Sequence, residues 1–378
     1  MPTVASVTGE VGPFEFLNPV DVHYGRGRLR ELEALVSRPT LIVTSAGTMD
    51  RVRIESIFRD RDDIHVYSGV TPNPGPVAID EGAALGESLD VRTIVGLGGG
   101  SALDAATCIA LLAGNDDSVL SLRQRLTQSE QLTRRVRLIQ VPTSAGSGSE
   151  VTRWASVWEP DGRKWSLEHP TAYADVALVD PSLTDTMGPR LTAATGLDAL
   201  AHAVESIWST GATPPGDALA VSALRLVRTA LPSTVSHPDP EGRDSMALAA
   251  LLAGLALASA RSATAHALSY SLTGRFGIEH GLATGLMCRA LLPSYAEACA
   301  ERVSVIMEAL SVSSFSEAEA FIDEVFRLAG LEPSLRFFGL SEEDLHDVAR
   351  DATQADRIGN SRLAPGIDEL LSALRRVA

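Results

Sequence analysis

The chain has 378 residues, of which 45% are hydrophobic and 21% are charged, and its net charge is −16. This length is enough for two domains with separate cores, and the negative charge excludes nucleic acid and anionic membranes as partners. No apolar run of about 18 residues or signal-peptide pattern is present, which predicts no membrane span. The three cysteines lack CxxC spacing, which favours a reducing cytoplasm.

Apolar, β-rich runs alternate with helical patterns before residue 187. Such alternation predicts a mostly parallel sheet with helices on both faces. From residue 188 onward, Ala, Leu and Glu recur at helical spacing. We therefore expect an α/β dinucleotide-binding domain over 1–187 and an all-α domain over 188–378, with the ligand in the cleft between them. The predicted strands are TLIVTS (40–45), IHVYSGV (64–70), TIVGLGGGS (93–101), VRLIQVPTS (136–144) and VALVDPS (176–182).

The stretch VGLGGGSALDAA (95–106) carries an apolar strand into a glycine turn and then a helix. Glycines let the backbone approach a phosphate, and the helix N-terminus stabilises its charge. The turn therefore predicts a dinucleotide pyrophosphate site, although a tight turn without a ligand has the same pattern. The residues expected to bind the cofactor here are Gly98, Gly99, Gly100, Ser101 and Asp104.

A second turn of the same character is VPTSAGSGSEVT (141–152). Its hydroxyl side chains can line the phosphates or the nicotinamide of a cofactor, or simply cap a helix. We assign Thr143, Ser144 and Ser147 to the cofactor and Ser149 to the substrate.

Asp198 and His202 stand four residues apart in TGLDALAHAVES (195–206), which places them on one helical face. Such a pair alone is typical of a structural hydrogen bond. Downstream, however, His266 and His280 follow in a chain with eight histidines. One carboxylate and three imidazoles form a suitable ligand set for iron or zinc, so the four residues are a predicted metal site.

Four stretches together resemble the iron-dependent, or group III, alcohol dehydrogenases: GGGSALDAA, PTSAGSGSEVT, DPSLTDTMGPRLTAATGLDALAHAVES and HALSYSLTGRFGIEHG. The resemblance extends over nearly the whole chain. It implies an N-terminal dinucleotide-binding α/β domain, a helical C-terminal domain and a metal held by Asp198, His202, His266 and His280. It also implies a homodimer.

Three positions depart from the pattern of that family. Thr107 replaces a lysine that often ends the glycine motif. Ser45 stands where NAD-preferring members carry an acidic residue that repels a 2′-phosphate, so both NADH and NADPH are admitted and NADPH is favoured. Tyr270 replaces a common second histidine, which makes its phenol a candidate catalytic proton donor.

A narrower resemblance, carried by SEVTRWASVWEPDGRKWSLEHP and by Tyr270, is to phosphonoacetaldehyde reductases. It implies reduction of phosphonoacetaldehyde to 2-hydroxyethylphosphonate in phosphonate antibiotic biosynthesis. A phosphonate needs charge-assisted donors, and Arg261 reads as lying on one helix with His266. The cations expected to bind this small anionic aldehyde are Arg153, Arg163, Lys164 (the single lysine of the chain), Arg261 and Arg275.

The sequence thus predicts a metal-dependent, NAD(P)H-linked aldehyde reductase that contains Fe²⁺ or Zn²⁺. The alternatives are a general alcohol or lactaldehyde dehydrogenase, a maleylacetate-reductase-like enzyme, a lyase built like dehydroquinate synthase, and a non-catalytic metal-binding scaffold.

Overall fold

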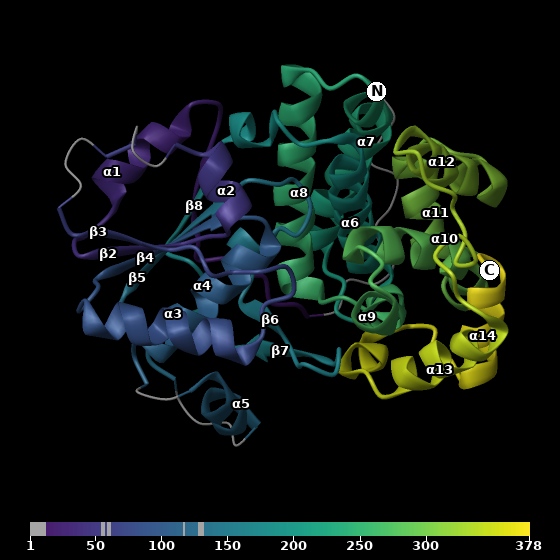
Figure 1. Ribbon diagram of the computed structural model, residues 1–378. Helices are drawn as coiled ribbons and strands as arrows, with labels where there is room; N and C mark the ends of the chain where they lie inside the picture. The colour runs from purple at the N-terminus through teal and green to yellow at the C-terminus, as the bar shows by residue number, and fades with distance from the viewer. Residues whose placement is uncertain (1–12, 54–56, 59–61, 116–117, 128–131) are drawn as a thin grey trace. The chain divides into compact units, whose positions relative to one another are not determined.

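The computed structural model describes residues 13–53, 57–58, 62–115, 118–127 and 132–378, and it divides into two compact units (Figure 1). The sheet unit comprises Asn18–Ser144 and Gly148–Thr186. The helical unit comprises Met187–Ala378, Ala145–Ser147 and the described residues 13–17. The predicted boundary after residue 187 lies one residue beyond the crossing at Thr186, and nothing in the sequence pattern indicated that 145–147 group with the helices.

A six-stranded, fully parallel sheet forms the centre of the sheet unit (Figure 1). The five predicted strands are all present, and each begins within one residue of its predicted start. A sixth strand, β1, was not predicted. In spatial order the strands are β1 (Asp21–Tyr24), β8 (Val176–Val179), β5 (Arg137–Pro142), β4 (Thr93–Gly98), β2 (Thr40–Val43) and β3 (Ile64–Tyr67).

Alternate residues of the central strands enter two separate hydrophobic cores, as the pleat requires. Leu41 and Ile94 point into the core under α3 (Pro76–Ser88), α4 (Gly100–Leu112) and α5 (Val119–Thr127). Ile42 and Val95 point into the other core, under α1 (Leu32–Leu35) and α2 (Ala46–Arg51). Helices therefore cover both faces of the sheet, which confirms the predicted α/β architecture (Figure 1).

An antiparallel hairpin of β6 (Trp154–Trp158) and β7 (Lys164–Glu168) was not predicted. Ala155, Val157 and Leu167 of the hairpin extend the core that contains α4. The hairpin is the part of the sheet unit that carries three of the predicted substrate cations.

Nine α-helices, one short 3-10 helix (Asp356–Asn360) and no strand are present in the helical unit over residues 187–378, all of which the structure describes. Two of them begin with proline in the first turn after a side chain that caps the helix, Thr213 in α7 and Asp239 in α8. The helices are α6 (Pro189–Trp208), α7 (Pro214–Ser236), α8 (Pro240–Ala260), α9 (Thr264–Phe276), α10 (His280–Ala298), α11 (Ala300–Ala309), α12 (Phe315–Leu328), α13 (Glu342–Thr353) and α14 (Ile367–Arg375).

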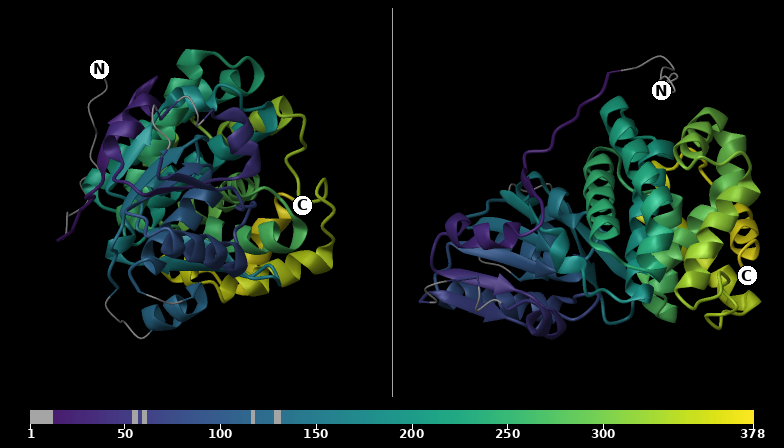
Figure 2. Two further views of the ribbon diagram at one scale, coloured as in Figure 1. Left: turned by 60° about the vertical axis from the view of Figure 1, so that its left-hand side comes forward. Right: turned by 90° about the horizontal axis from the view of Figure 1, so that it is seen from above.

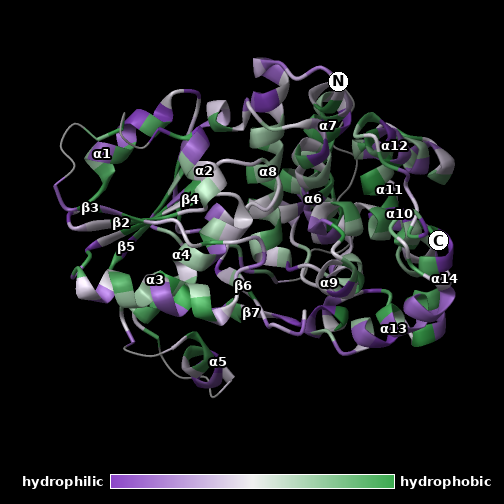
Figure 3. Ribbon diagram, in the orientation of Figure 1, coloured by the Kyte–Doolittle hydropathy of each residue, from purple (hydrophilic) through white to green (hydrophobic). Residues whose placement is uncertain are grey.

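Helix α6 is the buried centre of this unit and packs against α7, α8 and α10. The long helices α6, α7 and α8 pack against one another and lie side by side in the right-hand view of Figure 2. Helix α8 is long and apolar enough to cross a membrane, but it is mostly buried, as a core helix is. By contrast, α13 alternates hydrophobic and hydrophilic residues in Figure 3, because only its Leu345, Val348, Ala349 and Ala352 side is buried.

Helix α10 approaches α6 unusually closely at its first turn. A Cβ atom added to Gly281 would overlap the Ala194 carbonyl oxygen and would lie 2.9 Å from Cβ of Asp198. Only glycine allows this approach. It brings His280, the first residue of α10, beside Asp198 on α6.

Candidate active site

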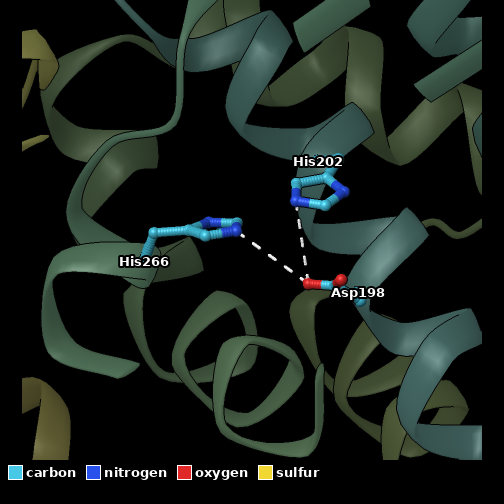
Figure 4. A group of neighbouring side chains, drawn as sticks. All are labelled: Asp198, His202 and His266. Carbon is cyan, nitrogen blue, oxygen red and sulfur yellow. Dashed lines mark ion pairs between the residues drawn. The ribbon is translucent and has the colours of Figure 1, made fainter. Parts of the chain in front are cut away.

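Four predicted ligands from three helices converge in the helical unit. Asp198 and His202 lie one turn apart on α6, His266 is on α9 and His280 begins α10. The Asp198 Oδ1 atom lies 3.7 Å from Nε2 of His202 and 3.9 Å from Nε2 of both His266 and His280. Figure 4 shows the first two imidazoles pointing toward the carboxylate. The sequence prediction therefore identified residues that the fold brings together.

A hydrogen bond or polar contact on the far side of each ring orients the three imidazoles. Nδ1 of His266 lies 2.6 Å from Oε2 of Glu205. Nδ1 of His202 lies 3.3 Å from the Gly146 carbonyl oxygen, and Nδ1 of His280 lies 3.3 Å from Oγ of Ser269. In each case Nε2 is the nitrogen that faces Asp198. This is the arrangement expected of metal-binding histidines, whose second nitrogen usually has a protein partner.

The donor set and its spacing fit a divalent transition metal. One carboxylate oxygen and two imidazole nitrogens, from Asp198, His202 and His266, all lie within 4.8 Å of one another, and the three residues are buried. Ligands about 2.1 Å from a tetrahedral ion would be about 3.4 Å apart, so small movements of these side chains complete such a shell. Mixed nitrogen and oxygen donors suit iron and zinc.

Glu205 belongs to this site and was not singled out from the sequence. It is fully buried on α6, three residues after His202. Burial raises the pKa of its carboxyl to about 7, and hydrogen bonds from the backbone amides of Ala263, Ala265 and His266 oppose that rise. The available signal was spacing, because residues 198, 202 and 205 lie on one face of a helix.

Tyr270, the predicted proton donor, lies beside the cluster. It follows His266 by one turn on α9, and its ring stacks near that of His280, with centroids 6.2 Å apart and planes 21° apart. The phenol is therefore held near a predicted metal ligand.

The predicted cofactor residues of the sheet unit follow three adjacent strands. Ser45 follows β2, Gly98 ends β4 and Gly99–Ser101 follow it, and Thr143 and Ser144 follow β5. Carboxyl ends of parallel strands meet at one edge, and the chain leaves β2 and β4 in opposite directions along the sheet. Dinucleotides bind at such a switch point in open α/β sheets.

Close backbone packing shapes the glycine turn at this edge. Gly98 has a φ of +157°, and a Cβ atom there would lie 2.6 Å from Cβ of Ala102. Gly99 precedes the first residue of α4, and its added Cβ atom would lie 3.3 Å from Oγ of Ser144. The turn thus brings backbone, not side chains, to the N-terminus of a 13-residue helix, where an anion is stabilised.

Asp104 and Ser149 are bonded to each other. Oδ1 of Asp104 accepts a 2.7 Å hydrogen bond from Oγ of Ser149, and Oδ2 accepts a 2.9 Å bond from the Ser156 amide. Burial raises the pKa of Asp104, while these donors and the charge of Lys164 oppose that rise. The carboxylate thus fastens the hairpin to α4. Thr107, the departure from the family lysine, is buried and accepts a 2.9 Å bond from Nε2 of Gln140.

Three of the five predicted substrate cations form ion pairs with carboxylates of the protein. Arg153 lies 3.1 Å from Glu168, Arg163 lies 2.7 Å from Asp161, and Arg275 bonds Asp347 and Asp351 at 3.0 and 3.1 Å. These carboxylates would compete with a phosphonate.

The five cations are also not gathered within either unit. Arg153 and Lys164 lie at opposite ends of the hairpin, about 17 Å apart along the strand. Arg261 does not share a helix with His266, so that prediction was wrong: it ends α8 with a φ of +64°, and α9 begins only at Thr264. Three of the cations lie in the sheet unit, and Arg261 and Arg275 lie in the helical unit, so neither unit by itself contains the whole predicted set.

Most of the chain is similar in sequence to known proteins. The model of the iron-containing alcohol dehydrogenases matches residues 19–181, and the model of the C-terminal part of that family matches residues 192–375. The long-chain-alcohol dehydrogenase 1 of Geobacillus thermodenitrificans is 36% identical over 355 residues, which is 89% of each chain.

Two solved structures share the fold over almost their full length. The sulfoacetaldehyde reductase of Bifidobacterium kashiwanohense in complex with NAD⁺ superposes with a TM-score of 0.88 at 27% identity and covers 97% of this chain and 99% of its own. A 1,3-propanediol oxidoreductase has a TM-score of 0.87 at 26% identity, with 97% and 100% covered. Together with the site geometry, these matches show that the chain belongs to the iron-containing alcohol dehydrogenase family, whose members are oxidoreductases.

Proposed function

We propose that this enzyme reduces a short anionic aldehyde to a primary alcohol with NAD(P)H, at a divalent metal held by Asp198, His202, His266 and His280. The convergence of three Nε2 atoms on one oxygen of Asp198 carries the metal assignment. Fe²⁺ is the preferred ion because of the family, and Zn²⁺ suits the same donors. The test is metal analysis of the purified protein alongside activity after chelation and reloading.

When bound, the metal supplies Lewis-acid polarisation of the carbonyl oxygen, and the dihydronicotinamide supplies a hydride. Residues of this chain bind and orient the cofactor and donate the proton. The glycine turn and the amides that open α4 bind and orient the pyrophosphate. Tyr270 holds a proton on its phenol beside His280, and we assign it the role of donating that proton to the product oxygen.

NADPH is the proposed coenzyme, with NADH also accepted. Ser45 caps α2, and its Oγ accepts a 3.3 Å hydrogen bond from the Thr48 amide. It follows β2 at the switch point, where a carboxylate would repel the 2′-phosphate of NADPH. A hydroxyl at this position leaves room for that phosphate.

Phosphonoacetaldehyde is the proposed substrate, with 2-hydroxyethylphosphonate as the product. The similarity to a sulfoacetaldehyde reductase supports this proposal. Sulfoacetaldehyde, like phosphonoacetaldehyde, is a two-carbon aldehyde that carries a tetrahedral anionic group. Lys164 is the proposed cation, because it lies on the hairpin that Asp104 bonds to α4, the helix whose N-terminus forms the proposed phosphate site. A neutral longer aldehyde is the second candidate, favoured by the 36% identical long-chain-alcohol dehydrogenase.

Rates of NADPH oxidation with phosphonoacetaldehyde, sulfoacetaldehyde and propionaldehyde at equal concentrations distinguish these substrates. We expect the phosphonate to give the highest kcat/KM and Lys164→Met to reduce that value for both anionic aldehydes but not for propionaldehyde. Equal values for all three in the wild type would contradict an anionic substrate.

We further propose a cytoplasmic homodimer. Cys108 and Cys288 are free and buried, as suits a reducing compartment. Sedimentation equilibrium of the purified chain tests the dimer.

A further inference from the structure

The buried carboxylate of Glu205 accepts hydrogen bonds from the segment that begins α9 and carries His266. Oε2 of Glu205 accepts a 2.8 Å hydrogen bond from the Ala263 amide, and Oε1 accepts bonds from the amides of Ala265 at 2.6 Å and His266 at 3.4 Å. These are amides at the start of α9, which have no partner within that helix. Glu205 therefore replaces a helix cap at this point.

The same carboxylate also bonds the imidazole of His266. Oε2 of Glu205 lies 2.6 Å from Nδ1, and the side chains of both residues are almost completely buried. Three amide donors favour the ionised carboxylate, which can only accept hydrogen bonds. When Glu205 is ionised, the imidazole proton is on Nδ1 and the lone pair of Nε2 points toward Asp198.

We propose that Glu205 is a positioning residue that fixes both the tautomer and the ring orientation of His266 and so sets the metal affinity of the site. The inference rests on the proposed metal site. Glu205 itself is not a ligand, because its oxygens are directed to Nδ1 and to backbone amides. An outer carboxylate of this kind typically changes metal affinity by about 10- to 100-fold.

Substitution by glutamine separates this role from simple packing. Gln has the size of Glu, but its amide nitrogen donates hydrogen bonds. In either orientation of Glu205→Gln, the NH₂ group would face the amides at the start of α9 or the Nδ1–H group. One of these donors loses its acceptor, and a donor facing Nδ1 moves the imidazole proton to Nε2.

The experiment is a titration of the metal-free protein with Co²⁺ against a competing chelator, for the wild type, Glu205→Gln, His266→Ala and the double variant. We expect Glu205→Gln to weaken Co²⁺ binding about 10- to 100-fold. In the His266→Ala background the same change should have an effect of less than about twofold, since the residue acts through that ring. Glu205→Asp, which keeps an acceptor, should recover part of the affinity.

Asp217→Asn is the matched control, because Asp217 is another buried carboxylate of the helical unit, paired with Arg302 on α11. It should lower thermal stability without changing Co²⁺ affinity. If Glu205→Gln does not fold, Glu205→Asp in both backgrounds provides the same comparison.

If Glu205→Gln binds Co²⁺ with wild-type affinity, or if the change reduces that affinity equally with and without His266, the inference about Glu205 is overturned. The proposed metal site would not be affected by either result. A wild type that binds no Co²⁺, or binds it equally after His266→Ala, would instead overturn the proposed metal site.

Discussion

The Oδ1 atom of Asp198 lies 3.7 Å from Nε2 of His202, one turn further along the same buried helix. This separation is longer than a hydrogen bond and suits two ligands of one ion. His202→Ala should therefore reduce bound metal and lower kcat/KM at least about a hundredfold, because three ligands hold the ion less well. Metal content per chain and NADPH oxidation measure both effects. Full metal content in this variant would contradict the assignment.

Coenzyme preference should depend on the residue that follows β2. Ser45→Asp places a carboxylate where it bonds ribose hydroxyls and repels a 2′-phosphate. We expect kcat/KM for NADPH to fall about tenfold or more, while that for NADH is kept or rises. Ser45→Asn, similar in size but uncharged, is the control and should retain NADPH. A parallel loss with both variants would indicate a steric effect.

Tyr270 provides a test of proton donation. Tyr270→Phe keeps the ring beside His280 and removes the hydroxyl. General acids contribute about 10²- to 10⁴-fold, but water can substitute, so we expect kcat to fall about tenfold with metal content unchanged. An unchanged kcat at every pH would remove the phenol from the mechanism.

The close contact of α10 with α6 should be sensitive to one methyl group. Gly281→Ala places a Cβ atom against the Ala194 carbonyl and near Asp198. Overpacking of this kind costs about 1–3 kcal/mol, and the displaced helix carries His280. Both the free energy of unfolding and the metal affinity should fall. Gly359→Ala, where an added Cβ meets nothing within 4 Å, is the control.

Asp175 predicts a pH-dependent contribution to stability. Burial raises the pKa of its carboxyl, but Arg134, 2.6 Å away, and the Leu138 amide outweigh burial and hold the pKa below its usual range. A lowered pKa means that this stability is present above the pKa of the unfolded state and is lost as pH falls through the folded value. Asp175→Asn should therefore unfold more easily than the wild type at pH 7, and the two should converge at acidic pH. A constant difference across that range would contradict the ion pair.

The sheet and the metal ligands could be predicted because their signals are local. The five predicted strands are rich in apolar, mostly β-branched residues, and Asp198 and His202 have helical spacing. Strand β1 was missed because DVHY is short and polar, and the hairpin because its strands, WASVW and KWSLE, are short and include Ser, Lys and Glu.

The ion-pair partners of the predicted substrate arginines could not be predicted from the sequence. Whether an arginine binds a ligand depends on its partners, and Asp347 and Asp351, which bond Arg275, are more than seventy residues further along the chain. No local pattern shows such a pairing. Glu205 was missed likewise, because its bond to His266 joins residues 61 positions apart.

The short segment Ala145–Ser147 has a practical consequence for dissecting this enzyme. It groups with the helices although both of its flanks belong to the sheet unit, and its Gly146 carbonyl lies 3.3 Å from Nδ1 of His202. A fragment cut at the obvious boundary, 188–378, would contain all four metal ligands yet lack that carbonyl. The helical unit therefore cannot be exchanged between relatives as the segment 188–378 alone. Residues 145–147, which lie within the sequence of the sheet unit, would have to be exchanged with it.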